Sequence, residues 1–133
     1  MVLSAPDLPD IDSPETARAG AHAVFSLRTR WHLTWAQLAR LLGVRSESTL
    51  QNWTSRVPES LAPDVLDRMG YLIAIFHALE QIRGGERSEQ WLRAANAGSP
   101  FFGRRPLDYM LGGRMTDLVE TYHYLKGVAT GAF

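Results

Sequence analysis

The sequence predicts an all-α protein of six or seven helices, and three observations support that class. Apolar residues recur at steps of three and four positions in several segments, which is the period of one helix face. Capping and proline signals precede these segments, as in Ser13-Pro14-Glu15. Paired glycines follow two of them, at Gly84-Gly85 and Gly112-Gly113, where a helix is expected to stop.

Composition limits the kind of protein this can be. The chain has 133 residues, 45% of them hydrophobic, which suits one globular domain or two small ones with a shared core. It contains no cysteine, so disulfides and cysteine-ligated metals are excluded. We find no signal-peptide pattern and no run near the roughly 18 apolar residues of a membrane helix, so we expect a cytoplasmic protein without a membrane partner.

Charge is neutral in total but uneven along the chain. Residues 27–57 carry five arginines against one glutamate, a local excess of +4 in a protein whose formal net charge is zero. A local basic excess allows a DNA-binding element to lie in a neutral protein.

The first half of the chain opens with a tail and a long helix. Residues 1–13, rich in Pro and Asp, are expected to be disordered. The first helix should start at Pro14 and run to about Trp31. Its predicted buried side consists of Ala17, Ala21, Val24, Phe25 and Trp31.

Residues 34–55 have the pattern of a helix-turn-helix. Thr34 caps a helix whose apolar face is Trp35, Leu38, Ala39 and Leu42. Gly43 supplies the turn, Val44 packs beneath it, and a third helix from about Ser46 or Ser48 to Ser55 turns Leu50 and Trp53 inward. This segment resembles the Xre-type DNA-binding domain, with one extra turn residue within Arg45-Ser46-Glu47. Residues 14–60 are therefore predicted to be a DNA-binding domain.

The exposed side of the third helix is where DNA would be read. Gln and Asn side chains pair with adenine edges, whereas Arg takes guanine or phosphate. Arg40 and Arg45 are assigned to phosphates. The predicted DNA-binding residues are Arg40, Arg45, Ser48, Thr49, Gln51, Asn52 and Arg56. The alternative is a helical hairpin that binds nothing.

The second half, residues 61–133, begins with the longest predicted helix, from Pro63 to Arg83, which both halves share. Its predicted core side is Val65, Leu66, Met69, Leu72, Ile73, Phe76, Leu79 and Ile82. Ser88 should cap a short helix containing Trp91 and Leu92, and Pro106 should open another. The last helix should start at Arg114 or Thr116 and end at Gly127, with a face of Met115, Leu118, Val119, Tyr122 and Leu125.

The stretch from Trp91 to Gly113 organises this second half. The order Trp91, Asn96, Gly103, Pro106-Leu107 and Gly112-Gly113 resembles the C-terminal toxin-binding domain of the Xre/MbcA/ParS antitoxin family. The resemblance implies a type II antitoxin that blocks the active site of an NAD-consuming RES-domain toxin. It also implies a homodimer or larger assembly that represses its own operon by binding promoter DNA.

The loop within this stretch supplies most of the predicted toxin contacts. Asn96 should hold the loop by hydrogen bonds to backbone groups, and Gly103 should need a backbone angle closed to other residues. Neighbours in an extended loop point opposite ways, so one of Phe101 and Phe102 should anchor the core and the other should face the partner. The predicted toxin-binding residues are Asn96, Phe101, Phe102, Gly103, Arg104, Arg105, Pro106, Leu107, Tyr122, Tyr124, Lys126, Val128 and Phe133. The alternative is an ordinary loop attached to a helical core.

The resemblance implies that the end of the chain, residues 122–133, lies at the mouth of the toxin's active site. The residues after Gly127 are small, and Phe133 adds an apolar end group beside the terminal carboxylate, which can pair with a cation. The alternative is a frayed terminus.

No catalytic or metal site is predicted. The histidines His22, His32, His77 and His123 are scattered, and none pairs with another at ligand spacing. We therefore predict a protein that is not an enzyme and has no cofactor. The competing function is a stand-alone helix-turn-helix transcriptional regulator whose C-terminal half dimerises.

Overall fold

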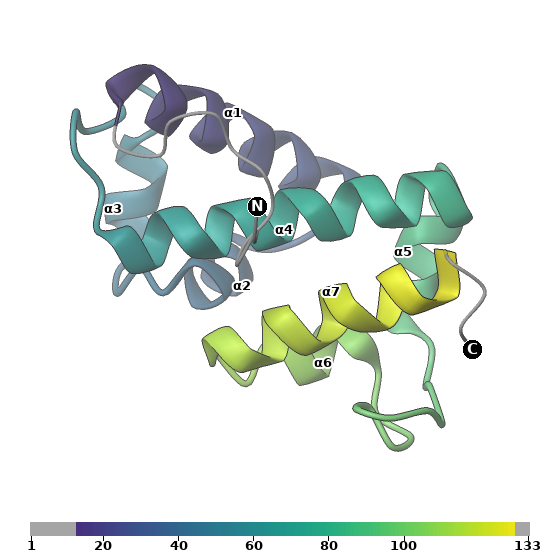
Figure 1. Cartoon of the computed structure of the whole chain (residues 1–133). Helices are drawn as coiled ribbons and strands as arrows, with labels where there is room; N and C mark the ends of the chain where they lie inside the picture. Colours follow the sequence, from purple (N-terminus) through teal and green to yellow (C-terminus); the bar gives the residue numbers. More distant parts are fainter. Residues whose placement is uncertain (1–12, 130–133) are drawn as a thin grey trace, which may run out of the picture. The chain divides into compact units, whose positions relative to one another are not determined.

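The computed structural model describes residues 13–129, which contain seven α-helices and no β-strand (Figure 1). The all-α prediction is confirmed. Residues 1–12, most of the predicted tail, and residues 130–133, including Phe133, lie outside the described residues. The helices are α1 (Pro14–Arg30), α2 (Trp35–Leu42), α3 (Glu47–Asn52), α4 (Pro63–Ile82), α5 (Glu86–Arg93), α6 (Pro106–Met110) and α7 (Met115–Ala129).

Contacts divide the chain into two compact units, Met1–Ile73 (unit 1) and Ala74–Phe133 (unit 2). The division falls inside α4, so this 20-residue helix contributes its first half to unit 1 and its second half to unit 2. The predicted domains, 14–60 and 61–133, place their boundary just before α4 and stay a prediction.

The start of α1 agrees with the sequence. The Ser13 Oγ accepts a hydrogen bond from the Thr16 backbone N–H at 3.0 Å, and Pro14 occupies the first helical position. The predicted burial is wrong at one position, because Leu27 is 1% exposed while Phe25 is only half-buried. The ring of Phe25 lies edge-on to Trp35, with 5.6 Å between the ring centroids, so it covers the start of α2 from the surface.

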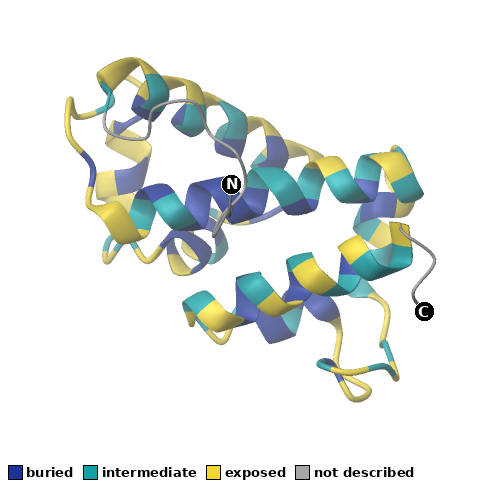
Figure 2. Cartoon of the chain, viewed as in Figure 1, coloured by how far each residue is buried: buried dark blue, intermediate teal, exposed yellow. Residues whose placement is uncertain are grey.

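The helix-turn-helix is confirmed in α2 and α3. Thr34 and Gln37 form a capping box, in which each side chain accepts the other residue's backbone N–H. Ser46 caps α3, which is shorter than predicted because residues 53–55 continue as a turn. Leu50 and Trp53 point inward as predicted, with 0% and 8% exposure. Figure 2 shows how α3 keeps its remaining positions on the exposed side.

Unit 2 corrects two predicted helix ends. Ser88 does not cap α5, which begins earlier, at Glu86 after Gly85. Ser88 is instead 2% exposed, and its hydroxyl donates to Glu80 Oε2 at 3.0 Å, so the side chain joins α5 to α4. The prediction that α7 ends at Gly127 is also wrong, because the helix continues to Ala129. A glycine disfavours a helix by only about 1 kcal/mol, which neighbouring residues can offset.

The buried side of α7 also differs from the predicted apolar face. Asp117, Leu118, Thr121 and Leu125 are buried, whereas Met115, Val119 and Tyr122 are half-buried. The two polar residues can be buried because they are hydrogen-bonded, as buried polar groups must be. The Thr121 hydroxyl, for example, donates to the Asp117 carbonyl at 2.8 Å.

Candidate functional site

The exposed side of α3 is the first candidate surface, and it belongs to unit 1. Four predicted DNA-binding residues lie on this helix, and all four are exposed: Ser48, Thr49, Gln51 and Asn52. The opposite side is held in the core by Leu50. The structure therefore gathers on one side of one helix the polar side chains that suit contacts to base edges.

The three predicted arginines flank α3 rather than lying on it. Arg40 is in the last turn of α2, Arg45 is in the turn before α3, and Arg56 follows its end; all three are exposed. The Arg56 backbone N–H donates to the Asn52 carbonyl at 3.0 Å, which ties this residue to the helix end. Cations at both ends of such a helix are placed for phosphates, because the DNA backbone borders the groove that the helix enters.

An ion pair that we did not predict supports the turn between α2 and α3. Arg68 of α4 is 9% exposed, and its Nε donates to Asp64 Oδ2 at 2.8 Å. A Cβ atom at Gly43 would lie 3.1 Å from both of these atoms, and Gly43 has a φ of +71°. Glycine is therefore required both for its backbone angle and for the close approach to the pair. The four-residue spacing of Asp64 and Arg68 was the signal in the sequence.

The second candidate surface is the loop between α5 and α6, in unit 2. Two backbone hydrogen bonds close its base, from Asn96 N–H to the Arg104 carbonyl at 3.1 Å and from Gly103 N–H to the Asn96 carbonyl at 2.7 Å. Inside the loop, the Asn96 Oδ1 accepts the Gly98 N–H at 2.9 Å. The prediction that Asn96 holds the loop through its side chain is confirmed.

Phe101 is the core anchor of this loop. It is 0% exposed, and its ring centroid lies 5.7 Å from Trp91, 5.4 Å from Tyr109 and 5.3 Å from Tyr124, in edge-to-face arrangements. The three partners come from α5, α6 and α7. One side chain of the loop is thus fixed against all three neighbouring helices.

Phe102 points the other way and is 76% exposed, the large hydrophobic residue that stands out among those described. The expectation that one phenylalanine anchors the core while the other points away from it is confirmed, whereas the partner contact of Phe102 stays a prediction. The reason given for the opposite directions is wrong. The loop is not extended there, because Phe102 has a φ of +50° and Gly103 one of +92°. Two successive left-handed residues reverse the chain and turn the Phe102 ring outward. The expected need for an unusual angle at Gly103 is also confirmed.

The basic pair after the loop is partly engaged within unit 2. The Arg105 guanidinium donates to both carboxylate oxygens of Asp108, from Nε at 2.6 Å and from a terminal nitrogen at 3.1 Å. This bidentate bond raises the pKa of Arg105. The Arg104 guanidinium lies over the Tyr109 ring, 5.7 Å from its centroid. Both arginines are exposed, whereas Pro106 and Leu107 are buried beneath them, where they can affect a partner only through the fold.

The predicted contacts of α7 divide between the loop and the surface. Tyr124 is half-buried beneath the loop, stacked on Trp91 with 6.0 Å between centroids, and its hydroxyl lies 3.4 Å from the Asn96 Nδ2. Tyr122 is half-buried, and the Lys126 Nζ lies 6.0 Å from its ring centroid. Val128 belongs to the last turn of α7 and is half-buried, not part of a tail after Gly127.

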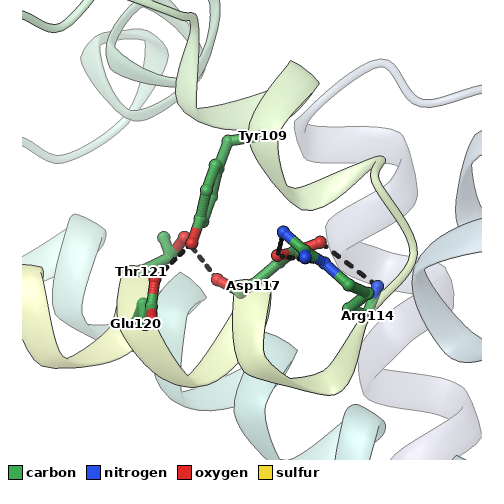
Figure 3. Close-up of polar contacts among 5 residues, drawn as sticks. All are labelled: Tyr109, Arg114, Asp117, Glu120 and Thr121. Carbon is green, nitrogen blue, oxygen red and sulfur yellow. Dashed lines mark hydrogen bonds and ion pairs between the residues drawn. The ribbon is translucent and has the colours of Figure 1, made fainter. Parts of the chain in front are cut away.

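A polar network that we did not predict joins α6 to α7 (Figure 3). The Tyr109 hydroxyl donates to a carboxylate oxygen of Glu120, and burial first, then this bond, raises the pKa of Tyr109 to about 12. Asp117 is 1% exposed and accepts the backbone N–H of Arg114 at 3.2 Å and its guanidinium at 3.0 Å. A Cβ atom at Gly112 would lie only 2.7 Å from Asp117 Oδ2, so glycine is required there.

Two other kinds of feature are absent from the described residues. Residues 13–129 contain no group of three or more His, Asp or Glu side chains that could hold a metal ion. No helix in the same range is both long and apolar enough to cross a membrane.

The exposed helix α3 follows α2 after a left-handed turn at Gly43, and α1 precedes both helices. This arrangement defines the helix-turn-helix class of protein. Residues 10–74 match the antitoxin Xre-like helix-turn-helix domain, which covers all of α1 to α3 and the first half of α4. The chain is also 32% identical, over 122 residues, to the uncharacterized protein y4oB of Sinorhizobium fredii, with 90% of this chain and 92% of y4oB covered.

The chain therefore belongs to the family of y4oB and carries an antitoxin Xre-like helix-turn-helix domain. This match supports two classes of protein: the antitoxin of a toxin–antitoxin pair, or a helix-turn-helix regulator.

Proposed function

We propose that this protein is the antitoxin of a type II toxin–antitoxin pair, with DNA binding in unit 1 and toxin binding in unit 2. The observation that carries the proposal is the presence in one chain of an Xre-like antitoxin domain and a rigid loop that exposes Phe102. An exposed aromatic side chain on a fixed backbone is the kind of residue that dominates affinity in protein interfaces.

The partner class is a cognate RES-domain toxin, an enzyme that consumes NAD, whose active site the antitoxin blocks. This part rests on the resemblance of the stretch from Trp91 to Gly113 to the Xre/MbcA/ParS toxin-binding domain. The contact surface consists of Phe102 with the exposed Arg104 and Arg105, while Asn96, Phe101 and Gly103 hold the loop. The end of α7 extends this surface toward the active site.

The test is growth rescue. The chain is co-expressed with a RES-domain toxin encoded by the neighbouring gene, and complex formation is measured by pull-down with the wild-type chain and the Phe102→Ala variant. Rescue by wild type and its loss in the variant support the proposal. A chain that neither rescues growth nor binds the toxin is not its antitoxin.

Unit 1 is proposed to bind promoter DNA, as a homodimer or larger assembly, and to repress its own operon. The exposed α3 residues read sequence and the flanking arginines hold phosphates. Mobility shift of the chain's own promoter, with light scattering for the assembly size, tests this half. If the chain shifts the promoter but no toxin gene accompanies its own, it is a stand-alone regulator. If neither the chain nor its toxin complex shifts the promoter, the DNA-binding half is rejected.

A purpose-built truncation tests the blocking role of the chain end. A cut before Val128 would remove part of the last turn of α7, so its effect on folding and on inhibition could not be separated. A cut after Ala129 keeps α7 intact and removes only residues 130–133. Full growth rescue by that shorter chain would reject these four residues as the blocking element and leave the loop as the inhibitory surface.

A further inference from the structure

A hollow of about 470 Å³ lies in unit 1 beside the end of α3. One wall is the first part of α1, and the other is the segment of residues 53–59 that follows α3. Trp53, 8% exposed, and the half-buried Phe25 contribute its apolar part.

The polar lining of the hollow is suited to an anion. Arg18 and His22 contribute from α1, and Ser55 and Arg56 contribute from the segment after α3. The Thr54 hydroxyl also lines the hollow, but it already donates to the Gln51 carbonyl at 2.7 Å. Glu59 is the acid of the lining, so two arginines against one glutamate leave a net charge of +1 with His22 neutral.

The two arginines keep their hydrogen-bonding capacity for a ligand. Within residues 13–129, the structure gives the side chains of Arg18 and Arg56 no hydrogen bond or ion pair, and both side chains are exposed. A guanidinium with five N–H donors matches the oxygens of a phosphate in a bidentate manner. Ser55 adds a hydroxyl donor, and a neutral His22 adds one N–H.

The position of the hollow points to the phosphate of DNA rather than to another anion. It begins one residue beyond α3, because Asn52 ends that helix, Trp53 and Thr54 line the hollow, and the Asn52 carbonyl accepts the backbone N–H of Arg56. A helix that enters a major groove has the sugar–phosphate backbone on either side of it. In the complex proposed above, one of these strands passes along the hollow.

We propose that this hollow is a phosphate-binding site for the DNA backbone. Arg18, Ser55 and Arg56 bind one phosphodiester group, and His22 donates a further hydrogen bond to it. The contact extends the DNA interface to Arg18 and His22 of α1, which lie outside the basic segment 27–57. It rests on the proposed DNA binding by unit 1. Such a contact adds affinity and fixes the angle of α3 on the duplex without reading sequence.

The experiment measures binding to two duplexes of about 30 base pairs, one from the DNA upstream of the coding sequence and one scrambled. Dissociation constants are measured by fluorescence anisotropy at several KCl concentrations for wild type, Arg18→Ala, Ser55→Ala and Arg45→Ala. Arg87→Ala is the matched control, because it removes one exposed arginine from unit 2. Thermal unfolding confirms that each variant folds.

Loss of one phosphate contact should lower the slope of log K against log salt by about 0.9. Raising KCl from about 50 to about 200 mM should then cost the Arg18→Ala variant roughly 3.5-fold less affinity than it costs wild type. The loss of affinity at low salt should be equal for both duplexes, and Ser55→Ala should give a smaller loss in the same sense. Arg87→Ala should keep the wild-type slope.

Four results would overturn the proposed phosphate site. If Arg18→Ala keeps the wild-type affinity and slope while Arg45→Ala binds more weakly, the phosphate site is rejected and the proposed DNA binding stands. If Arg18→Ala and Arg87→Ala have equal effects, the loss of affinity comes from the change in net charge and not from a phosphate site. If inorganic phosphate shifts the NMR signals of residues 53–56 while Arg18→Ala binds both duplexes normally, the hollow takes a free anion instead. A wild type that binds neither duplex rejects both proposals.

Discussion

The two adjacent phenylalanines offer the sharpest test of the loop, because one substitution at each should have opposite consequences. Phe101→Ala removes a side chain that is 0% exposed and contacts rings from three helices. Truncation of a fully buried phenylalanine typically costs about 3–5 kcal/mol of unfolding free energy. Phe102→Ala removes a side chain that is 76% exposed, where a change within about 0.5 kcal/mol is expected.

These free energies convert into melting temperatures that are easily separated. An unfolding entropy of about 2.1 cal/mol/K per residue gives roughly 0.28 kcal/mol/K for this chain. Phe101→Ala should therefore lower the Tm by about 11–18 °C, whereas Phe102→Ala should change it by less than about 2 °C. Circular dichroism at 222 nm measures both. If Phe101→Ala fails to fold, Phe101→Leu keeps most of the volume and should show the same effect at about a third of the size.

The partner assay gives the second half of the same prediction. Phe102→Ala should weaken the toxin complex at least tenfold, about 1.4 kcal/mol, while its Tm stays at the wild-type value. Comparable losses of Tm in both variants would contradict the division of roles. A normal complex with Phe102→Ala would show that the exposed ring is not the contact.

Three further predictions concern the glycine turns and the network between α6 and α7. Gly43→Ala should lower the free energy of unfolding by about 1–3 kcal/mol, more than Gly103→Ala. Both glycines have a positive φ, but only Gly43 has side-chain atoms 3.1 Å from the added Cβ. Urea unfolding compares the two variants. Gly112→Ala should lower the free energy of unfolding by about 1–3 kcal/mol, because the added Cβ displaces Asp117. A variant as stable as wild type would show that this carboxylate is not held in place. Because the pKa of Tyr109 is raised to about 12, its neutral form stabilises the fold at and below pH 10, and this stability is lost as the pH rises through about 12. Tyr109→Phe should therefore lose less stability than wild type between pH 10 and pH 12, as measured by thermal unfolding.

Local signals in the sequence were sufficient to predict most of the fold. The caps at Ser13 and Thr34, the proline at the start of α6 and the glycine after α2 each act over a few residues, so the pattern alone indicates them. Ser88 shows the limit of this approach. Its type and position suit a cap, but its hydroxyl is used by Glu80 of the preceding helix, a tertiary contact that no local pattern contains.

The buried polar residues were missed for a related reason. A search for apolar periodicity assigns Asp117 and Thr121 to the solvent, and it therefore rotates the buried face of α7 toward Met115 and Tyr122. Their burial depends on partners that the fold supplies, such as the backbone N–H of Arg114. The same holds for Arg68, whose burial makes sense only when Gly43 and Asp64 are seen beside it.

The candidate sites were predictable as segments but not as surfaces. The sequence marked the loop from Asn96 to Arg105, yet which phenylalanine faces outward depends on the left-handed backbone at Phe102. In the same way, the basic segment marked α3 and its flanking arginines, whereas the hollow beside it needs Arg18 from α1. Residues far apart in sequence become one surface only through packing.

The conformation of Phe102 is itself an argument for function. A left-handed backbone costs an ordinary residue about 1–2 kcal/mol relative to glycine, and asparagine tolerates it better. The ring recovers none of this within unit 2, because it is 76% exposed, and exposing it to water is unfavourable as well. Folding alone would be better served by glycine or asparagine at this position. A residue that opposes both local conformation and solvation, on a loop held by Asn96 and anchored by Phe101, favours the proposal that a partner covers the Phe102 ring.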